Sequence, residues 1–213
     1  MGKLPINLND LLRQRTVEGE RIEYKTGWNP DAIIRTLCAF ANDFENLGGG
    51  YVVIGQDCDA NGQPEFPPVG LADNQLDKIQ RELLAHCQLI QPPYFPVLSI
   101  EEVEGRKLIV LWAPGGQTRP YKAPESVTAK HKVWKYFIRR YSSTVEAKGD
   151  TEQELLSLAA KVPPFSALID LLLTTLTDPD GVTLRSTLSI TPTGHELRYG
   201  RLTSSNVYGP EDQ

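Results

Sequence analysis

Residues 18–25 read EGERIEYK and residues 38–59 read CAFANDFENLGGGYVVIGQDCD, and these two stretches decide the fold. In the first, charged side chains alternate with Ile22 and Tyr24, as in a strand that buries one face. The second is the end of a helix, a turn of three glycines and a continuous apolar run, Tyr51–Ile54, which is typical of a central strand. Both strands lie beside carboxylates. The sequence therefore predicts a place where acidic side chains from two strands converge, as a divalent metal ion requires.

The periodicities on either side of these stretches define the other elements. Asn29 followed by Pro30 is typical of a helix start, because asparagine caps the first free N–H groups and proline suits the first helical position. We expect a short helix near Leu8–Leu12, longer helices over residues 30–45, 74–88 and 151–161, and strands over residues 97–103, 107–112 and 133–140. Glu104-Gly105-Arg106 indicates a hairpin. The predicted fold class is α+β, with a mixed, mostly antiparallel sheet and packed helices.

Pro163-Pro164 predicts a domain boundary near residue 165. We expect residues 1–165 to form one domain and residues 166–213 to form a C-terminal extension. Within the extension, the apolar residues 168–176 predict a helix, and Thr, Ser, Gly and Pro dominate from residue 177 onward. We expect this tail to be irregular or ordered only by a partner. A homo-oligomer or a partner protein would use residues 166–213.

The charge is unevenly distributed along the chain. The net charge is −5, but residues 119–148 carry +6 and the rest of the chain −11. This uneven charge distribution favours an anionic partner, because lysine and arginine neutralise phosphates. The aromatic residues of the segment favour nucleic acid in particular, because aromatic rings stack on unpaired bases. The candidate nucleic-acid-binding residues are Arg119, Tyr121, Lys130, Lys132, Lys135, Arg139, Arg140 and Ser142. One face of the strand over residues 133–140 must enter the core, so we expect only part of this set to contact a ligand.

Other features narrow the class of protein. The three cysteines lack CxxC spacing, which indicates reduced thiols in a cytoplasmic protein. The N-terminus lacks the apolar core of a signal peptide, and no apolar stretch is long enough to span a membrane. Gly48–Gly50 precedes a strand and is not followed by Lys-Ser/Thr, so it is neither a P-loop nor a Rossmann turn. We interpret it as a tight turn, and Asn42 and Asp43 before it as capping and turn residues.

Four motifs in this order resemble a known family. Glu-x4-Glu-x-Lys at residues 18–25, Ala-Phe-Ala-Asn at 39–42, the glycine turn and Ile-Gly-x-Asp at 54–57 resemble the AlbA-type domain of the Schlafen family. Arg119-Pro-Tyr and the run YFIRRYSSTVEA at 136–147 are similar to the family's closing segment. The resemblance covers roughly residues 10–165. It implies nucleic-acid binding, because bacterial members are labelled DNA-binding proteins or transcriptional regulators.

The resemblance also implies a catalytic site of three carboxylates in this chain, by analogy with the eukaryotic members that cleave tRNA and rRNA. The matching residues here are Glu18, Glu23 and Asp57 or Asp59, which would hold Mg²⁺ or Mn²⁺ while Lys25 holds the scissile phosphate. Glu18 has the opposite strand parity to Glu23, so it joins this site only if Gly19 bends the strand; Glu20 is the alternative. In the other interpretation these are surface acids, and Lys25 pairs locally with Glu23.

Three functions remain open from the sequence. The first is a module that binds RNA or DNA, including a transcription regulator. The second is a metal-dependent ribonuclease acting on structured RNA such as tRNA. The third is an assembly subunit of a larger complex, by family analogy one of antiviral defence, which docks through its apolar segment 168–176.

Overall fold

The computed structural model describes Leu4 and residues 8–13, 19–160, 184–191 and 194–201. The chain divides into two compact units, residues 1–159 and 160–213, and each is described by itself. The elements in chain order are α1 (Leu8–Arg13), β1 (Ile22–Lys25), α2 (Pro30–Asn42), β2 (Gly50–Ile54), α3 (Asp73–Cys87), β3 (Val97–Val103), β4 (Arg106–Ala113), β5 (Lys122–Pro124), β6 (Trp134–Arg140), β7 (Ser143–Glu146), α4 (Asp150–Ala160), β8 (Leu184–Thr191) and β9 (Gly194–Arg201).

A four-stranded sheet of order β1-β2-β4-β3 forms the base of the first unit. β1 and β2 are parallel, with Glu23 opposite Val52, and α2 supplies the crossover that a parallel pair requires. β4 is antiparallel to both β2 and β3. The β3–β4 hairpin turns at Glu104-Gly105, where both φ angles are positive, as in a type I′ turn. The predicted α+β fold with a mixed, mostly antiparallel sheet is confirmed.

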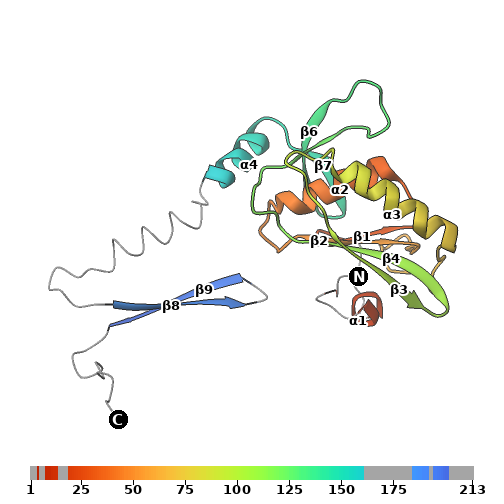
Figure 1. Cartoon of the computed structure of the whole chain (residues 1–213), viewed down its shortest axis with the longest axis horizontal. Helices are drawn as coiled ribbons and strands as arrows, with labels where there is room; N and C mark the ends of the chain where they lie inside the picture. The colour runs from red at the N-terminus through yellow and green to blue at the C-terminus, as the bar shows by residue number, and fades with distance from the viewer. Residues whose placement is uncertain (1–3, 5–7, 14–18, 161–183, 192–193, 202–213) are drawn as a thin grey trace, which may run out of the picture. The chain divides into compact units, whose positions relative to one another are not determined.

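Helices cover both faces of this sheet (Figure 1). On one face, α2 and α3 pack over a cluster that includes Val52, Ile54, Ile109 and Leu111. On the other face, α1 packs over a cluster that includes Ile22, Tyr24, Tyr51 and Val53. β1 was expected to bury only one face, but Ile22, Glu23 and Tyr24 are all buried.

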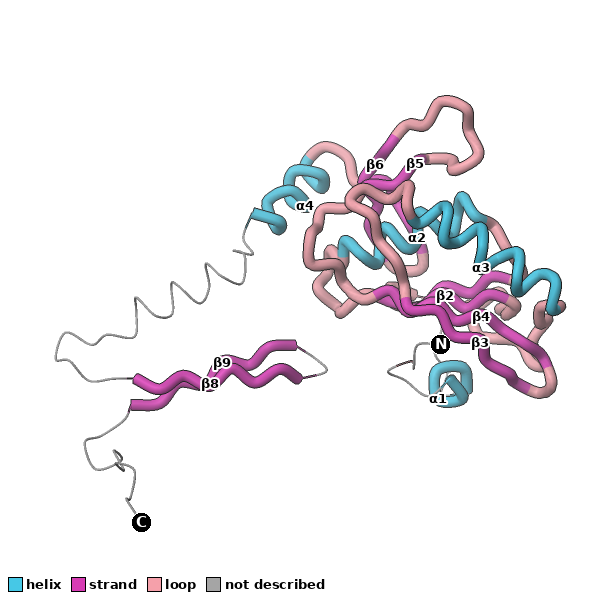
Figure 2. Tube along the Cα trace, in the orientation of Figure 1, coloured by secondary structure: helices cyan, strands magenta, loops and turns pink. Residues whose placement is uncertain are grey.

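α2 lies between two sheets, because it contacts β2 and β4 on one side and β5, β6 and β7 of a second sheet on the other (Figure 2). Its start is as predicted: Asn29 Oδ1 accepts a hydrogen bond from Ala32 N at 3.2 Å, and Pro30 is the first helical residue. The second sheet has the order β5-β6-β7 and is antiparallel. The sequence predicted β6 but not β5 or β7, which are only 3 and 4 residues long.

The glycine turn before β2 is confirmed as a close-packed turn. Gly49 has φ +79°, and a Cβ there would lie 2.0 Å from the carbonyl oxygen of Ala113. A Cβ on Gly50 would lie 2.4 Å from the ring of Phe40. Any side chain would therefore separate β2 from β4 or from α2, which is why the run requires glycine.

The second unit contains a β-hairpin in which β8 and β9 pair antiparallel, from Leu184 opposite Arg201 to Thr191 opposite Gly194. The tail from residue 177 onward was expected to be irregular or ordered only by a partner, and β8 and β9 are the part of it that the structure describes as strands. The helix predicted over residues 168–176 lies outside the described residues.

Candidate nucleic-acid interface

Glu23 is at the centre of a buried network that joins the two sheets of the first unit. It lies in β1, on the side facing α2, and its residue is 7% exposed. Its Oε2 accepts a hydrogen bond from Arg139 Nη1 at 2.6 Å, and its Oε1 accepts one from Lys25 Nζ. Both carboxylate oxygens of Glu23 are therefore bound to cations of the protein itself.

Arg139 brings the other half of this network from β6. Its Nη2 donates to the carbonyl of Gly19 at 2.6 Å, and its Nη1 also donates to Thr144 Oγ1 at 3.0 Å. The guanidinium lies over the ring of Phe40, with its carbon 5.4 Å from the ring centroid. The side chain is only 5% exposed. The expectation that Arg139 presents its charge to a phosphate on the surface is corrected by this burial.

The contacts of Lys25 match the interpretation in which this lysine pairs locally with Glu23. Besides the bond to Glu23, its Nζ lies 3.2 Å from the carbonyl oxygen of Tyr24, and 27% of the side chain is exposed. An ammonium between a carboxylate and a carbonyl is well compensated. Such a lysine stabilises the buried charge of Glu23, which would otherwise be costly to desolvate.

Asp57 and Asp59 follow β2, where their carboxylates organise the loop. Asp57 Oδ1 accepts from Cys58 N at 2.9 Å. Asp59 Oδ1 accepts from the backbone N–H groups of Asn61 and Gln63, each at 2.8 Å. The Gln63 bond, with smaller contributions from Asn61, holds the pKa of Asp59 below its usual range.

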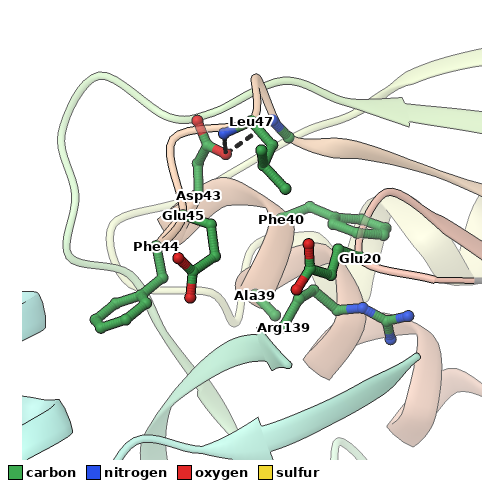
Figure 3. A pocket seen from close by; sticks show the side chains of 9 residues that line it. Glu20, Ala39, Phe40, Asp43, Phe44, Glu45, Leu47 and Arg139 are labelled. Atoms are coloured by element: carbon green, nitrogen blue, oxygen red, sulfur yellow. Dashed lines mark hydrogen bonds between the residues drawn. The ribbon is translucent and has the colours of Figure 1, made fainter. Parts of the chain in front are cut away.

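The metal site suggested by the family resemblance is not assembled by the described residues. Glu18 lies outside them. Within them, no three His, Cys, Asp or Glu side chains gather closely enough to hold one ion. A small pocket beside Arg139 has an acidic lining of Glu20, Asp43 and Glu45 (Figure 3). Asp43 binds backbone N–H groups there, and Glu45 pairs with Arg140, so neither carboxylate is an open metal ligand.

The end of α2 is a hub of hydrogen bonds that the sequence indicated only in part. Asp43 caps the helix in the left-handed region, and its carboxylate accepts from the N–H groups of residues 47–49, as predicted for turn chemistry. Asn42 reaches further, to the second sheet. Its Oδ1 accepts from Tyr121 N at 2.6 Å, while its Nδ2 donates to the carbonyls of Tyr121 and Phe137 at 2.9 and 2.8 Å.

Arg119 and Tyr121 belong to this hub. Arg119 Nη1 donates to the carbonyl oxygens of Asn42 and Asp43 at 3.3 and 3.1 Å, so it caps the C-terminus of α2, where cations are favoured. Tyr121 is buried against Tyr94, with ring centroids 5.4 Å apart. Tyr121 was expected to line an open groove, and its burial corrects that expectation.

Three other basic residues lie at the surface but are paired with acids. Lys135 Nζ lies 3.1 Å from both Glu125 Oε1 and Glu146 Oε2, and the bond to Glu125 contributes most to raising the pKa of this lysine. Lys148 shares Glu146, at 2.9 Å. Arg140 pairs with Glu45, and its guanidinium lies over the ring of Phe44. Glu125 and Glu146 are already counted in the +6 of the segment, and Glu45 offsets one further charge.

Three lysines of the segment have no carboxylate partner in the described chain: Lys122 in β5, and Lys130 and Lys132 in the loop between β5 and β6, which projects from the second sheet (Figure 2). Lys130 is exposed and Lys132 is half-buried, and neither pairs with a carboxylate of the described chain. The loop is anchored to the first turn of α2, because Asp31 accepts from Val127 N at 2.7 Å and from Ser126 Oγ at 3.1 Å. The exposed Tyr141 and Ser142 form the turn at the other end of β6.

Comparisons with known proteins found a matching family and similar solved structures. The family described as "Schlafen, AlbA_2" matches residues 18–148. The N-terminal domain of a RecG-related protein from Nitrosomonas europaea is 30% identical, with a TM-score of 0.42; the match covers 64% of this chain and 87% of that one. The DIP2311 protein from Corynebacterium diphtheriae is 14% identical, with a TM-score of 0.43, and the match covers 68% of this chain and 25% of that one. None of the curated proteins matches the chain.

None of the helices that the structure describes has the length and apolar character needed to cross a bilayer.

Proposed function

Because the chain belongs to the Schlafen AlbA_2 family, we propose that it is a nucleic-acid-binding protein whose phosphate contacts are made by the β5–β6 loop. The observation that carries this proposal is the pair Lys130 and Lys132. They lie together in the loop, outside the core, and have no acidic partner in the described chain; Lys122 of β5 is likewise half-buried and without a carboxylate partner. A phosphate meets an uncompensated charge there, whereas at Lys135, Lys148 and Arg140 it must first displace a carboxylate.

The anchoring of this loop supports the same proposal. Asp31 fixes its first residues, and Arg35 Nη1 donates to the carbonyl of Glu125 at 3.3 Å. Lys132 Nζ donates to the carbonyl of Ala129 at 3.1 Å, which orders the tip. A loop that is already ordered loses less conformational entropy when it binds, so its lysines contribute more to affinity.

The paired cations extend this surface. Surface ion pairs contribute only about 0–1 kcal/mol each, so Lys135, Lys148 and Arg140 can exchange a carboxylate for a phosphate at small cost. Ser142 adds a hydroxyl beside Arg140. Arg139 and Tyr121 are buried, and Arg119 is partly exposed but is held at the end of α2, so their role is to hold the surface in place.

We propose binding without hydrolysis. A divalent ion at Glu23 would have to displace Lys25 or Arg139 from the carboxylate, and Arg139 is too deeply buried to find another partner. Whether RNA or DNA is the natural ligand, and whether the protein regulates transcription or joins a larger complex, follows from the ligand that it prefers.

The test is fluorescence anisotropy with labelled RNA and DNA oligonucleotides over a range of salt concentrations. Lys130→Glu/Lys132→Glu should weaken binding, and losing two phosphate contacts should make the slope of log K against log salt shallower by about 1.4 for a single strand. The matched control is Arg106→Glu/Lys107→Glu in the β3–β4 hairpin, which changes the net charge equally. Equal affinities of the two double variants would refute the assignment to the loop.

A further inference from the structure

Tyr141 is an exposed aromatic residue at a turn position whose backbone conformation favours Gly, Asn or Asp. It is 81% exposed, the highest value among the exposed large hydrophobic residues that the structure describes. It is the first residue of the two-residue turn between β6 and β7, in which Arg140 pairs with Ser143. Single exposed apolar residues are common on protein surfaces, so exposure alone means little.

The backbone at Tyr141 supplies a second observation. Its φ is +55°, in the left-handed region that a bulky side chain rarely adopts. Among the other non-glycine residues with positive φ, Asp43 binds the N–H groups of the glycine turn and Asn46 is a residue type that tolerates this region. Glu104, like Tyr141, is the first residue of a two-residue hairpin turn, a position that requires positive φ. A tyrosine here costs about 1 kcal/mol of strain that glycine would avoid. Strain of this kind gathers at functional positions.

The strands behind the turn make it a rigid support. Phe137, Ile138 and Arg139 of β6 are buried, and Ile138 packs against Leu155 of α4. Next to the ring, Arg140 is held over Phe44, and Ser142 and Ser143 expose their hydroxyl groups. The turn therefore presents one aromatic face with hydrogen-bonding and cationic neighbours, which is the composition of a base-stacking platform.

Building on the proposed function, we infer that Tyr141 stacks on an unpaired base, and that the ligand is single-stranded nucleic acid or a looped segment of it. An uninterrupted duplex keeps its bases stacked on each other and has no free face for the ring. Phosphates bind at the β5–β6 loop, at one end of β6, and the base binds at the other end. The 7 residues of β6 place these two contacts about 20 Å apart.

The experiment measures the affinity of the full chain for four probes of one sequence, about 12 nucleotides long, within the site sizes of single-strand binders. The probes are single-stranded RNA, single-stranded DNA, the blunt duplex, and a single strand with abasic positions that keeps the phosphates. Tyr141→Ala should weaken single-strand binding roughly 5- to 150-fold, the range expected for one base–aromatic stack. Its affinity for the duplex and for the abasic strand should stay unchanged. Comparing the affinities for the single-stranded RNA and DNA probes shows which of the two supplies the unpaired base.

Two further variants separate the ring from the backbone. Tyr141→Phe keeps the stacking face and should bind like the wild type. Tyr141→Gly removes the ring and relieves the left-handed strain, so it should lose single-strand binding while its thermal midpoint stays equal or rises. A stable Gly variant that fails to bind identifies the ring as the cause.

The outcomes distinguish this inference from the proposed function. If Tyr141→Ala binds single strands as well as the wild type while Lys130→Glu/Lys132→Glu does not, the stacking role is overturned and the loop assignment stands. An equal loss on duplex and single strand also overturns stacking on an unpaired base. If the wild type binds none of the four probes, the proposed function itself fails.

Discussion

Arg139 Nη1 lies 2.6 Å from Glu23 Oε2, which joins β6 of the second sheet to β1 of the first through an ion pair between residues 116 positions apart. The pair is almost completely buried. Arg139 also binds Gly19 and Thr144, and Thr144 Oγ1 lies 2.9 Å from Thr36 Oγ1 of α2. Arg139 was predicted from the sequence to bind a ligand, but in the structure its charge joins the two sheets that enclose α2.

Removing either partner of this pair should destabilise the first unit strongly. Arg139→Met leaves Glu23 buried with only Lys25 as a cation, and losing one member of a buried pair costs about 3–5 kcal/mol. Urea unfolding followed by circular dichroism measures the loss. The double variant Glu23→Gln/Arg139→Met should lose clearly less than the sum of the single losses, because it leaves no fully buried orphan charge: Lys25 is 27% exposed and keeps its contact with the Tyr24 carbonyl. A cost below about 1 kcal/mol for Arg139→Met, as for an exposed pair, would contradict the prediction.

Asn42→Ala should cost more than an ordinary surface substitution of the same kind. It leaves the N–H of Tyr121 and the carbonyls of Tyr121 and Phe137 without their side-chain partner inside the core, where each unsatisfied group costs about 1–3 kcal/mol. The matched control is Asn61→Ala in the exposed loop after β2. Thermal unfolding of both variants compares them, and equal midpoints would show that the Asn42 bonds do not stabilise the hub.

Gly49→Ala and Gly105→Ala should separate steric clash from backbone strain. Both glycines have positive φ, +79° and +73°, so both variants should lose about 1 kcal/mol from the left-handed backbone. Only Gly49 also has a backbone oxygen 2.0 Å from the new Cβ, whereas nothing lies within 4 Å at Gly105. Expression level and unfolding midpoint should fall much further for Gly49→Ala. A Gly49→Ala protein as stable as Gly105→Ala would rule out the close approach of β2 and β4 at this turn.

Thiol labelling at pH 8 should modify Cys58 first. Cys38 and Cys87 are buried, and burial raises the pKa of each thiol to about 12, so both remain protonated and unreactive. Cys58 is partly exposed in the loop after β2. A folded-state pKa above the unfolded value means that the thiols of Cys38 and Cys87 favour folding up to about pH 8.5 and lose that contribution as the pH rises further.

The labelling prediction is checked by mass spectrometry of iodoacetamide-treated protein, with Cys58→Ser as control, which identifies the thiol that reacts first. Rapid labelling of Cys38 would contradict its burial.

Mn²⁺ should not produce cleavage of tRNA by this protein. Both oxygens of Glu23 are engaged by Arg139 and Lys25, so the carboxylate is not free to bind the ion. The assay compares wild type with Glu23→Gln, whose folding is checked by circular dichroism, using gel analysis of tRNA with and without Mn²⁺. Cleavage by the wild type that requires Mn²⁺ and disappears in Glu23→Gln would overturn the prediction and restore the hydrolytic interpretation.

The sequence by itself determined the elements whose signals are local. Asn29-Pro30 set the start of α2, the three glycines required a tight turn, and the apolar run after them became the central strand β2. Each of these follows from capping, backbone conformation or hydrophobic patterning within a few residues, so no distant contact was needed to predict it. β5 and β7 were missed because neither shows an apolar–polar alternation like that of β1: β5 reads Lys-Ala-Pro and β7 reads Ser-Thr-Val-Glu.

Only the tertiary structure decided which charges are open and which are buried. Alternation along β6 indicated that one face is buried, but the packing of that face against α2 placed Arg139 in the core and left Lys130 and Lys132 outside. The partner of Arg139 is Glu23, far away in the sequence, and Lys135 and Arg140 likewise find their acids on other elements. The role of a charged side chain is set by the groups that surround it in space, and those come together only when the two sheets close around α2.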